Sequence, residues 1–404
     1  MKVKVTAKVK AVTPNSQTLI GFLRAYRDWI QYVVNKIWNL NYIPSIKELH
    51  YKFYRVLREQ GFRSHHCHKI ERRARELVKA MRIKMKNGEK VSKPILKRLT
   101  ARLDYQDYKL NLEDKVLKIA VLNDEWVELK LIWYKHLDKY FSGEWKLKEI
   151  LVSYRDKIIW VYLTFEREVV VKPLRAVMGV DVNFNNITYT IVDLRGKLVS
   201  MGVILFNGLT RALTHRKIAE KLQRKYPKSW RFNKKVLEVI RKHYRRARNI
   251  LIDSSHYVSR RIVEIAKEYD AMIVLEKLNK LRTRGNGGKR FNWELSLWVY
   301  RKIQSYIHYK ALLEGLMVTY VNPKGTSKTS PLGGELKFIN YRWVKLPNGI
   351  VTSRDVIASW NLALRGCVPQ VVNGGMKALE GNETSIPMKG KPVQVTKILV
   401  VTKR

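Results

Sequence analysis

Apolar and polar residues follow two different periods along the chain, and the changes between them divide it into segments. Residues 2–12 alternate lysine with small apolar residues, which predicts a strand whose lysine face is either simply solvated or tracks phosphates. From about residue 17 to residue 99 the apolar residues recur at helical spacing. Residues 105–168 return to the period of two and contain two predicted hairpins. With residues 2–12, these strands are predicted to close a small β-barrel that carries the helices as an insertion.

The second half of the chain opens with three apolar segments, at 177–182, 187–192 and 199–206. Their lengths predict buried strands, and a helical pattern follows them. Strand, hairpin and helix in this order open an RNase H-like fold. A helix is predicted at about 293–314 and a strand at 317–321. The tail after Gly366 shows little pattern, apart from one further strand predicted at 393–402.

Three carboxylates stand at the ends of these elements. Asp181 lies in the first apolar strand, Glu276 follows the apolar run 271–275, and Asp355 opens a helical pattern. A charge inside an apolar strand costs several kcal/mol unless it is compensated, and a bound metal ion compensates it. Carboxylates are the ligands that hold two divalent ions around a phosphodiester. Each residue also has an ordinary interpretation, as a solvated strand end, a loop start and a helix N-terminal acid.

Composition narrows the class of partner. The chain has 404 residues and carries 80 Lys and Arg against 34 Asp and Glu, a net charge of +46, which points to a polyanion such as nucleic acid. No membrane partner is expected, because no run of about 18 apolar residues occurs. Only two cysteines occur and the N-terminus does not resemble a secretory signal, so a cytoplasmic prokaryotic protein is predicted. Scarce Cys with abundant Lys, Arg and Glu suits a thermophilic archaeon.

Basic residues gather in two helical segments. Residues 63–98 hold 13 Lys or Arg against three acids, and residues 211–248 hold 15 against two with aromatic residues interleaved. A solvated helix face and a nucleic-acid face both fit this pattern. The predicted nucleic-acid contacts, which include a basic glycine-rich loop, are Arg72, Arg73, Arg75, Lys242, Arg245, Arg246, Arg284 and Arg290.

A histidine-rich stretch in the first basic segment, residues 64–68, has the composition of a metal site. Four adjacent residues cannot all point at one ion, because ligands on a helix need a spacing of three or four. The stretch is therefore predicted to be a helix start and not a metal site.

The chain at this point resembles the TnpB (OrfB-type) family, transposon-encoded relatives of type V CRISPR effector nucleases. The resemblance covers most of the chain and is strongest over residues 176–366. The motifs around Asp181, Glu276 and Asp355 resemble the three RuvC motifs in the family's order and spacing. Supporting matches are Tyr309-Lys310-Ala311 with Glu314-Gly315, Val321-Asn322-Pro323 with Thr326-Ser327, and Asn361.

The resemblance implies a multidomain α/β fold with defined boundaries. Residues 1–15 and 100–172 would form a β-barrel wedge domain, and residues 16–99 a helical recognition lobe. Residues 173–366 would form an RNase H-like RuvC domain, interrupted at about 324–352 by a ribbon, and residues 367–404 a C-terminal tail. It also implies RNA-guided cleavage of double-stranded DNA beside a short flanking motif, with a guide RNA from the transposon end.

The family's four-cysteine zinc ribbon is degenerate here. Alignment on the neighbouring glycines places Ser330, Gly333, Lys345 and Asn348 at the four ligand positions. None of these residues can replace a thiolate, so no zinc is predicted. Two hairpins packed by aromatic residues are expected to survive. Ser353 and Ile357 also depart from the third motif, where the family usually has Asp and Asn.

The function predicted from the sequence is two-metal phosphodiester hydrolysis. Asp181, Glu276 and Asp355 would hold Mg²⁺ or Mn²⁺, with Asp181 between the two ions. A guide-RNA-dependent DNA-binding protein without cleavage is the main alternative. A DDE-type transposase, which also uses three carboxylates on this fold, is a weaker one, because the order Asp, Glu, Asp follows a basic helical N-terminal half.

Overall fold

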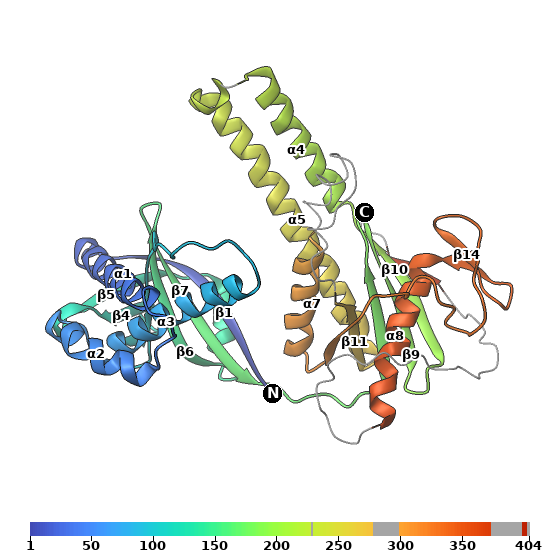
Figure 1. The fold of residues 1–404 in the computed structure, drawn as a ribbon, viewed down its shortest axis with the longest axis horizontal. Coiled ribbons are helices and arrows are strands. Elements are labelled where there is room, and N and C mark those ends of the chain that lie inside the picture. Colours follow the sequence, from blue (N-terminus) through green and yellow to red (C-terminus); the bar gives the residue numbers. More distant parts are fainter. Residues whose placement is uncertain (228, 278–298, 373–397, 402–404) are drawn as a thin grey trace. The chain divides into compact units, whose positions relative to one another are not determined.

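The structure is a computed structural model that describes residues 1–227, 229–277, 299–372 and 398–401. The chain divides into two compact units, residues 2–168 and essentially residues 169–404. Figure 1 shows the fold of both units. Within the described part of the chain, no hydrophobic cluster of buried residues is shared between them, and the second unit has a cluster on each face of its sheet.

The first unit is an antiparallel sheet with three helices. Its strands are β1 (Lys2–Val12), β2 (Leu99–Leu103), β3 (Tyr108–Asn111), β4 (Val116–Ala120), β5 (Trp126–Ile132), β6 (Lys146–Arg155) and β7 (Ile158–Glu168). The helices between β1 and β2 are α1 (Ser16–Trp38), α2 (Ile46–Glu59) and α3 (Ser64–Lys86). The predicted alternation of β1 is confirmed, since its odd positions from Val3 to Ala11 are mostly buried and its lysines exposed.

The sheet of the first unit is open, which corrects the prediction of a closed barrel. Its order is β2-β6-β7-β1-β5-β4-β3, and within residues 2–168, all of which are described, no ladder joins the edge strands β2 and β3. Residues of α1, α2 and α3 share one core with the strands. The helices therefore bury apolar surface that barrel closure would otherwise have buried, and they are not a lobe with a separate core.

The second unit is a mixed sheet with helices on both faces. Its strands are β8 (Ala176–Val182), β9 (Asn186–Asp193), β10 (Leu198–Leu205), β11 (Ala271–Glu276), β12 (Val318–Val321) and β16 (Ile398–Val401). Its helices are α4 (Gly208–Lys225), α5 (Lys234–Glu268), α7 (Tyr300–Leu313) and α8 (Arg354–Val372). In the order β12-β11-β8-β9-β10-β16, β8, β9 and β10 are antiparallel, whereas β11 runs parallel to β8 and to β12.

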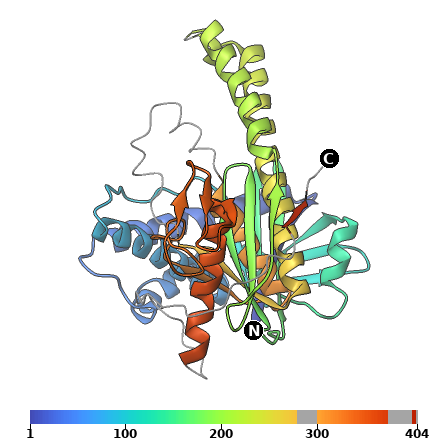
Figure 2. The ribbon, with the colours of Figure 1, turned by 90° about the vertical axis from the view of Figure 1, so that its right-hand side faces the viewer.

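The period of two in β8 and β11 divides this unit into two layers. Even positions of β8, such as Met178, pack with α5 and α7 in one core. The odd position Val177 packs with Val356 and other residues of α8 in a second core on the opposite face. In Figure 2, α4 and α5 lie side by side as a long hairpin that extends beyond the sheet. A small third sheet, the ribbon, is formed by β13 (Lys337–Phe338), β14 (Trp343–Lys345) and β15 (Val351–Ser353).

Two predictions about the end of the chain are corrected. The predicted boundary at residue 366 falls inside α8, which continues to Val372. The strand predicted at 393–402 is confirmed as β16, which pairs in parallel with β10, so residues 398–401 belong to the sheet of the second unit and not to a separate tail. A parallel edge strand far along the chain leaves no local signal except a short apolar run. The predicted helix 293–314 is described only from Tyr300 onward, and its predicted start lies outside the described residues.

Gly179 allows α8 to approach β8 closely. A Cβ at this position would lie 2.0 Å from the backbone oxygen of Ser359 and 2.4 Å from the backbone nitrogen of Ala363. Since both atoms belong to the helix backbone, they cannot give way as a side chain would.

We therefore expect Gly179→Ala to displace α8 and to destabilise the protein by about 3 kcal/mol or more. Thermal denaturation of the two proteins checks this. Gly21→Ala is the control, because no atom lies within 4 Å of the Cβ that it would add. A Gly179→Ala protein as stable as the parent would contradict the close approach.

Candidate active site

The three predicted carboxylates come together because of the strand period and the place where α8 begins. Asp181 is an odd position of β8 and Glu276 an even position of β11, so both lie on the face that α8 covers. These strands are parallel neighbours, and both residues stand near their carboxyl ends. Asp355 is in the first turn of α8. The structure thus gathers on one face the side chains that the sequence singled out.

Asp181 is the most enclosed of the three, with 9% of its surface exposed. Asn183 Nδ2 donates a hydrogen bond to its Oδ2 at 3.0 Å and also lies 3.2 Å from Asn186 Oδ1. Asn183 hydrogen-bonds the carboxylate of Asp355 as well. One amide therefore connects two of the three carboxylates.

Glu276 is held by residues that follow β12 and by α7. Thr326 Oγ1 lies 3.4 Å from its Oε1, and Gln304 Nε2 donates to its backbone oxygen at 2.9 Å. Burial raises the pKa of Glu276, while the Thr326 hydroxyl and the charge of Arg365 lower it. The Arg365 guanidinium donates to the backbone oxygens of Asn322 and Lys324, which holds the same loop against α8.

Asp355 owes its position to the start of α8. Ser353 Oγ accepts a hydrogen bond from the Val356 backbone N–H at 3.2 Å, as a helix-capping side chain does. Serine and aspartate both serve this purpose, so the departure at residue 353 preserves the cap. Ile357, the other departure, is fully buried in the core beneath α8. Burial raises the pKa of Asp355, and Arg342 and Arg354 lower it.

The electrostatics of the cluster favour a bound cation. Burial, followed by the charges of Glu276 and Asp355, raises the pKa of Asp181 to about 8. The negative charges of Glu276 and Asp355 repel an ionised Asp181, and a divalent cation would relieve that repulsion. The donors are all oxygen atoms, which suits Mg²⁺ or Mn²⁺ better than zinc or copper. The type of donor atom is therefore compatible with the divalent ions that the sequence predicted.

Sequence reasoning named Thr326 and Asn361 only as matches to the family, and it missed that they and Asn183 position the carboxylates. Asn183 was visible as a polar residue two positions after Asp181, but its role depends on the turn before β9. Asn361 is 8% exposed, and its Nδ2 donates to the backbone oxygens of Thr326 and Thr329 at 2.8 and 2.7 Å. It thereby fixes the loop that carries the Thr326 hydroxyl toward Glu276.

We expect Asn183→Ala to slow any metal-dependent reaction of this site by about 10–100-fold, the usual cost of losing a residue that orients metal ligands. The affinity for Mg²⁺, read from the metal dependence of the rate, should fall in parallel. Asn207→Ala, an exposed position before α4, is the matched control. Unchanged metal dependence in Asn183→Ala would contradict the positioning role.

The ribbon is built without thiolates at the predicted zinc positions. Ser330 is buried, and its Oγ accepts from the Leu332 backbone N–H at 3.3 Å; Asn348 Oδ1 accepts from the Ile350 N–H at 3.2 Å. The two turns abut, since a Cβ on Gly334 would lie 3.1 Å from Pro347. Gly333 adopts a left-handed φ of 76° and Lys345 lies in β14 with its side chain exposed.

Apolar packing and one arginine hold the ribbon in place of a metal. Val344 and Leu346 are buried in the core beneath α8. The Arg354 guanidinium donates to the Tyr341 backbone oxygen at 3.0 Å and lies over the rings of Tyr341 and Phe338 at 5.1 and 5.7 Å. Because Arg354 immediately precedes Asp355, the ribbon is tied directly to the carboxylate cluster.

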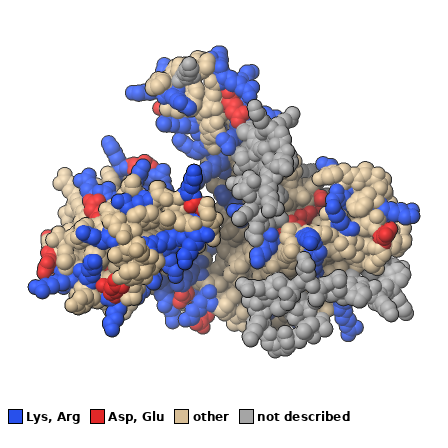
Figure 3. All heavy atoms as spheres, in the orientation of Figure 1, with Lys and Arg blue, Asp and Glu red and all other residues tan. Residues whose placement is uncertain are grey.

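The predicted nucleic-acid contacts occupy different environments. Arg72 is exposed on α3, and Arg73 pairs with Glu76 at 3.4 Å. Arg75 is half-buried and donates to the Pro44 backbone oxygen at 2.7 Å, which gives it a structural role. The exposed contacts on α5 are Lys242, Arg245 and Arg246. Arg284 and Arg290 lie outside the described residues. Figure 3 shows Lys and Arg side chains along the α4–α5 hairpin and over both units.

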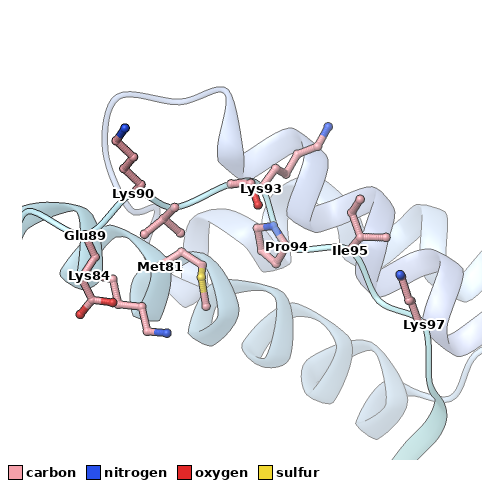
Figure 4. A pocket seen from close by; sticks show the side chains of 10 residues that line it. Met81, Lys84, Glu89, Lys90, Lys93, Pro94, Ile95 and Lys97 are labelled. Atoms are coloured by element: carbon pink, nitrogen blue, oxygen red, sulfur yellow. The ribbon is translucent and has the colours of Figure 1, made fainter. Parts of the chain in front are cut away.

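A pocket of about 480 Å³ in the first unit is lined by lysines of the basic segment 63–98 that the sequence did not name individually. It lies between the end of α3 and the extended segment 89–97, as Figure 4 shows. Its lining contains Lys84, Lys90, Lys93 and Lys97. Four ammonium groups with one acid, Glu89, favour a polyanion over an apolar ligand.

Comparisons with known proteins agree with this arrangement. A family model described as "Cas12f1-like, TNB domain" matches residues 300–362, which include α7, the ribbon and the start of α8. A second model, described as the uncharacterized protein MJ0013 family, matches residues 22–120. The fold resembles the protein of the Cas12f1-sgRNA-target DNA complex with a TM-score of 0.58 and 14% identity, over 90% of this chain and 99% of that one.

Sequence relatives extend across both prokaryotic domains. The chain is 31% identical over 231 residues to the TnpB-like protein MJ0751 of Methanocaldococcus jannaschii, covering 56% of this chain and 81% of that protein. It is 27% identical over 271 residues to the TnpB-like protein aq_aa05 of Aquifex aeolicus, covering 61% and 86%. The CRISPR-associated endodeoxyribonuclease Cas12f2 of a Micrarchaeota archaeon is 24% identical over 270 residues, covering 62% and 46%.

None of the helices in the described part of the chain is both long and apolar enough to cross a membrane. The two TnpB-like relatives are matched over 81% and 86% of their own length. With more than four-fifths of the archaeal TnpB-like protein matched at 31% identity, the chain belongs to the TnpB family, among the relatives of type V CRISPR effectors.

Proposed function

We propose that this protein is an RNA-guided endonuclease that cleaves double-stranded DNA beside a short flanking motif. The observation that carries the proposal is the convergence of Asp181, Glu276 and Asp355 on one face of a mixed sheet. The names of the relatives support it, since one is a CRISPR-associated endodeoxyribonuclease and another was solved with a guide RNA and target DNA.

The proposed chemistry is metal-dependent hydrolysis of a phosphodiester. Divalent ions bound at this cluster would supply an activated water and charge stabilisation for the leaving 3′ oxygen. Asp181, the most buried of the three, is proposed to contact both ions, with Glu276 and Asp355 completing their ligand sets. Asn183 and Thr326 orient these carboxylates. No general-base side chain is needed for this reaction.

The domain assignment is proposed on the same basis. The strands of the first unit would form the wedge domain, and its helices within residues 16–99 the recognition region. The second unit would be a RuvC-type nuclease domain of RNase H-like topology, with residues of about 324–352 as its zinc-less ribbon. The guide RNA would come from the transposon end, and the basic surfaces would hold RNA and DNA by their phosphates.

A plasmid-cleavage assay tests the proposal. The protein is co-expressed with its native downstream DNA, and the plasmid carries a guide-matched target flanked by randomised bases. Cutting that requires guide, Mg²⁺ and one flanking sequence supports the proposal and identifies that sequence. Target binding without cutting supports the alternative of a guide-dependent DNA-binding protein. The three carboxylates argue against that alternative, and the loss of the ribbon thiolates and Ser353 leave it open. Strand joining in addition to cutting would indicate a transposase.

The basic face of α5 gives a separate prediction. We expect the combined change of Lys242, Arg245 and Arg246 to Ala to weaken guide-RNA binding and to reduce the dependence of log K on log salt by about 2. Titrations at several salt concentrations measure both quantities. Arg260→Ala is the matched control on the same helix, because Glu264 pairs with that guanidinium at 2.8 Å. An unchanged salt dependence would show that this face does not contact phosphates.

A further inference from the structure

Two helices of the first unit bring two imidazoles and a carboxylate together. His50 comes from α2, and His68 and Glu71 come from α3. One ligand atom from each of the three lies within 4.8 Å of the other two. The shortest separations are 3.4 Å from His50 Nδ1 to Glu71 Oε2 and 3.9 Å from His68 Nδ1 to the same oxygen.

The Glu71 carboxylate is the unusual member of this cluster. Its side chain is fully buried, and Oε1 has no hydrogen-bond partner among the described residues. A buried carboxylate is costly unless a cation or several donors satisfy it. The only hydrogen bond described for its other oxygen is the long contact with His50. Within the ranges that the structure describes, Oε1 therefore has no donor that satisfies it.

The two imidazoles leave a route from solvent to this carboxylate. Their side chains are 35% and 41% exposed for His50 and His68 respectively. The rings stack with centroids 4.6 Å apart at 11°, and Tyr54 covers the His50 ring at 4.3 Å. The cluster thus has a buried end, a wall of aromatic side chains and an open end where a water could complete a ligand set.

We propose that His50, His68 and Glu71 bind one first-row divalent transition ion, which fastens α2 to α3. Two imidazole nitrogens and one carboxylate oxygen are a ligand set that Zn²⁺ and its neighbours prefer, and that Mg²⁺ does not. A tetrahedral ion with bonds of about 2.0–2.1 Å needs ligand atoms about 3.3 Å apart. The imidazoles would have to rotate about χ2, a soft torsion, to bring their nitrogens to that separation around the ion.

The position of the cluster gives the ion a structural task. Helix α2 has only three buried residues, Leu49, Phe53 and Leu57, to anchor it. A metal joining it to α3 would add a cross-link between the two helices. Sequence reasoning dismissed residues 64–68 as a metal site because adjacent residues cannot share an ion. The site instead uses the helical spacing of His68 and Glu71 together with a histidine from another helix, which only the tertiary structure supplies.

Zn²⁺ and Co²⁺ binding to the full-length protein tests the proposal, which does not depend on nuclease activity. The parent for this experiment carries Asp181→Asn, so that the carboxylate cluster of the second unit contributes less to metal binding. We expect a single equivalent of Zn²⁺ to bind and to raise the melting temperature. Co²⁺ should give the visible absorption of a tetrahedral nitrogen–oxygen site.

Three variants should each weaken Zn²⁺ binding strongly. The expected loss is larger than the roughly 10–100-fold that follows when a metal ligand loses its outer-shell partner. They are His50→Ala, His68→Ala and Glu71→Gln, the last of which keeps the shape of the buried side chain. His65→Ala, on the same helix but outside the cluster, is the matched control. Absence of Zn²⁺ binding by the parent, or equal binding by all four variants, would overturn the proposal. Circular dichroism confirms that each variant is folded.

Discussion

Asp181→Asn is expected to reduce DNA cleavage by at least about 10³-fold and to leave guide-RNA and target binding intact. The variant keeps the shape of the side chain and removes one of the charges proposed to hold divalent ions at the reacting phosphate. Metal ions supply several kcal/mol of transition-state stabilisation, and each 1.4 kcal/mol corresponds to about tenfold in rate. Binding depends instead on basic side chains and base pairing, which the substitution does not touch.

Single-turnover cleavage and target binding by the RNA-loaded protein measure the two quantities separately. Asp253→Asn is the matched control, because it removes an exposed carboxylate of α5 in the same unit. Cleavage by Asp181→Asn at the parent rate would refute the role proposed for Asp181. A parent that binds its target but never cuts would leave the three carboxylates without a catalytic role and favour the DNA-binding alternative.

The same residue is expected to make the metal-free protein less stable as the pH rises. The folded protein holds the Asp181 pKa at about 8, whereas an unfolded aspartate has an ordinary value of about 4. Between these values the folded state binds more protons than the unfolded state, so the free energy of unfolding falls with rising pH. The loss is complete above about pH 8 and has an upper limit of roughly 5 kcal/mol.

Denaturant titrations in EDTA at pH 5, 6, 7 and 8 measure this effect. Asp181→Asn cannot ionise, so the variant should show a flatter profile and exceed the parent in stability at pH 8. Millimolar Mg²⁺ should stabilise the parent at pH 8 and the variant much less, because ion binding favours the folded carboxylate cluster. Parallel pH profiles for the two proteins in EDTA would contradict the proposed burial and mutual repulsion.

Much of the second unit was predictable because its sequence pattern is local and repetitive. Apolar runs of strand length predicted β8, β9, β10 and β11, and the residues that interrupt or end them were visible as carboxylates. Asp355 was visible because it opens a helical pattern. The short strands of the first unit and their turns were likewise predictable from the alternation of apolar and polar residues. That the sheet stays open was not predictable in this way. Whether the sheet closes depends on whether strands or helices cover its remaining apolar surface. The local period of apolar residues does not show which of the two occurs.

The roles of the residues that position the carboxylates could not be predicted from the sequence. Asn183 and Thr326 are ordinary polar residues in turns, and Asn361 is one polar residue on an apolar helix. Their hydrogen bonds to carboxylates and to backbone oxygens exist only because segments distant in sequence meet beside α8. The ribbon shows the same dependence. Its missing cysteines were evident from the sequence, but the packing of Val344, Leu346 and Arg354 that holds it was not.

By itself the sequence determined which residues can carry chemistry, which face of each strand they occupy and a net charge of +46, which favours a polyanionic partner. These properties follow from residue type, period and charge, all of which are local or additive along the chain. Only the tertiary structure decided that Asp181, Glu276 and Asp355 share one face, that the first sheet stays open, and that His50 meets His68 and Glu71. These are contacts between distant segments, set by how apolar surfaces pack together, and no single segment contains that information.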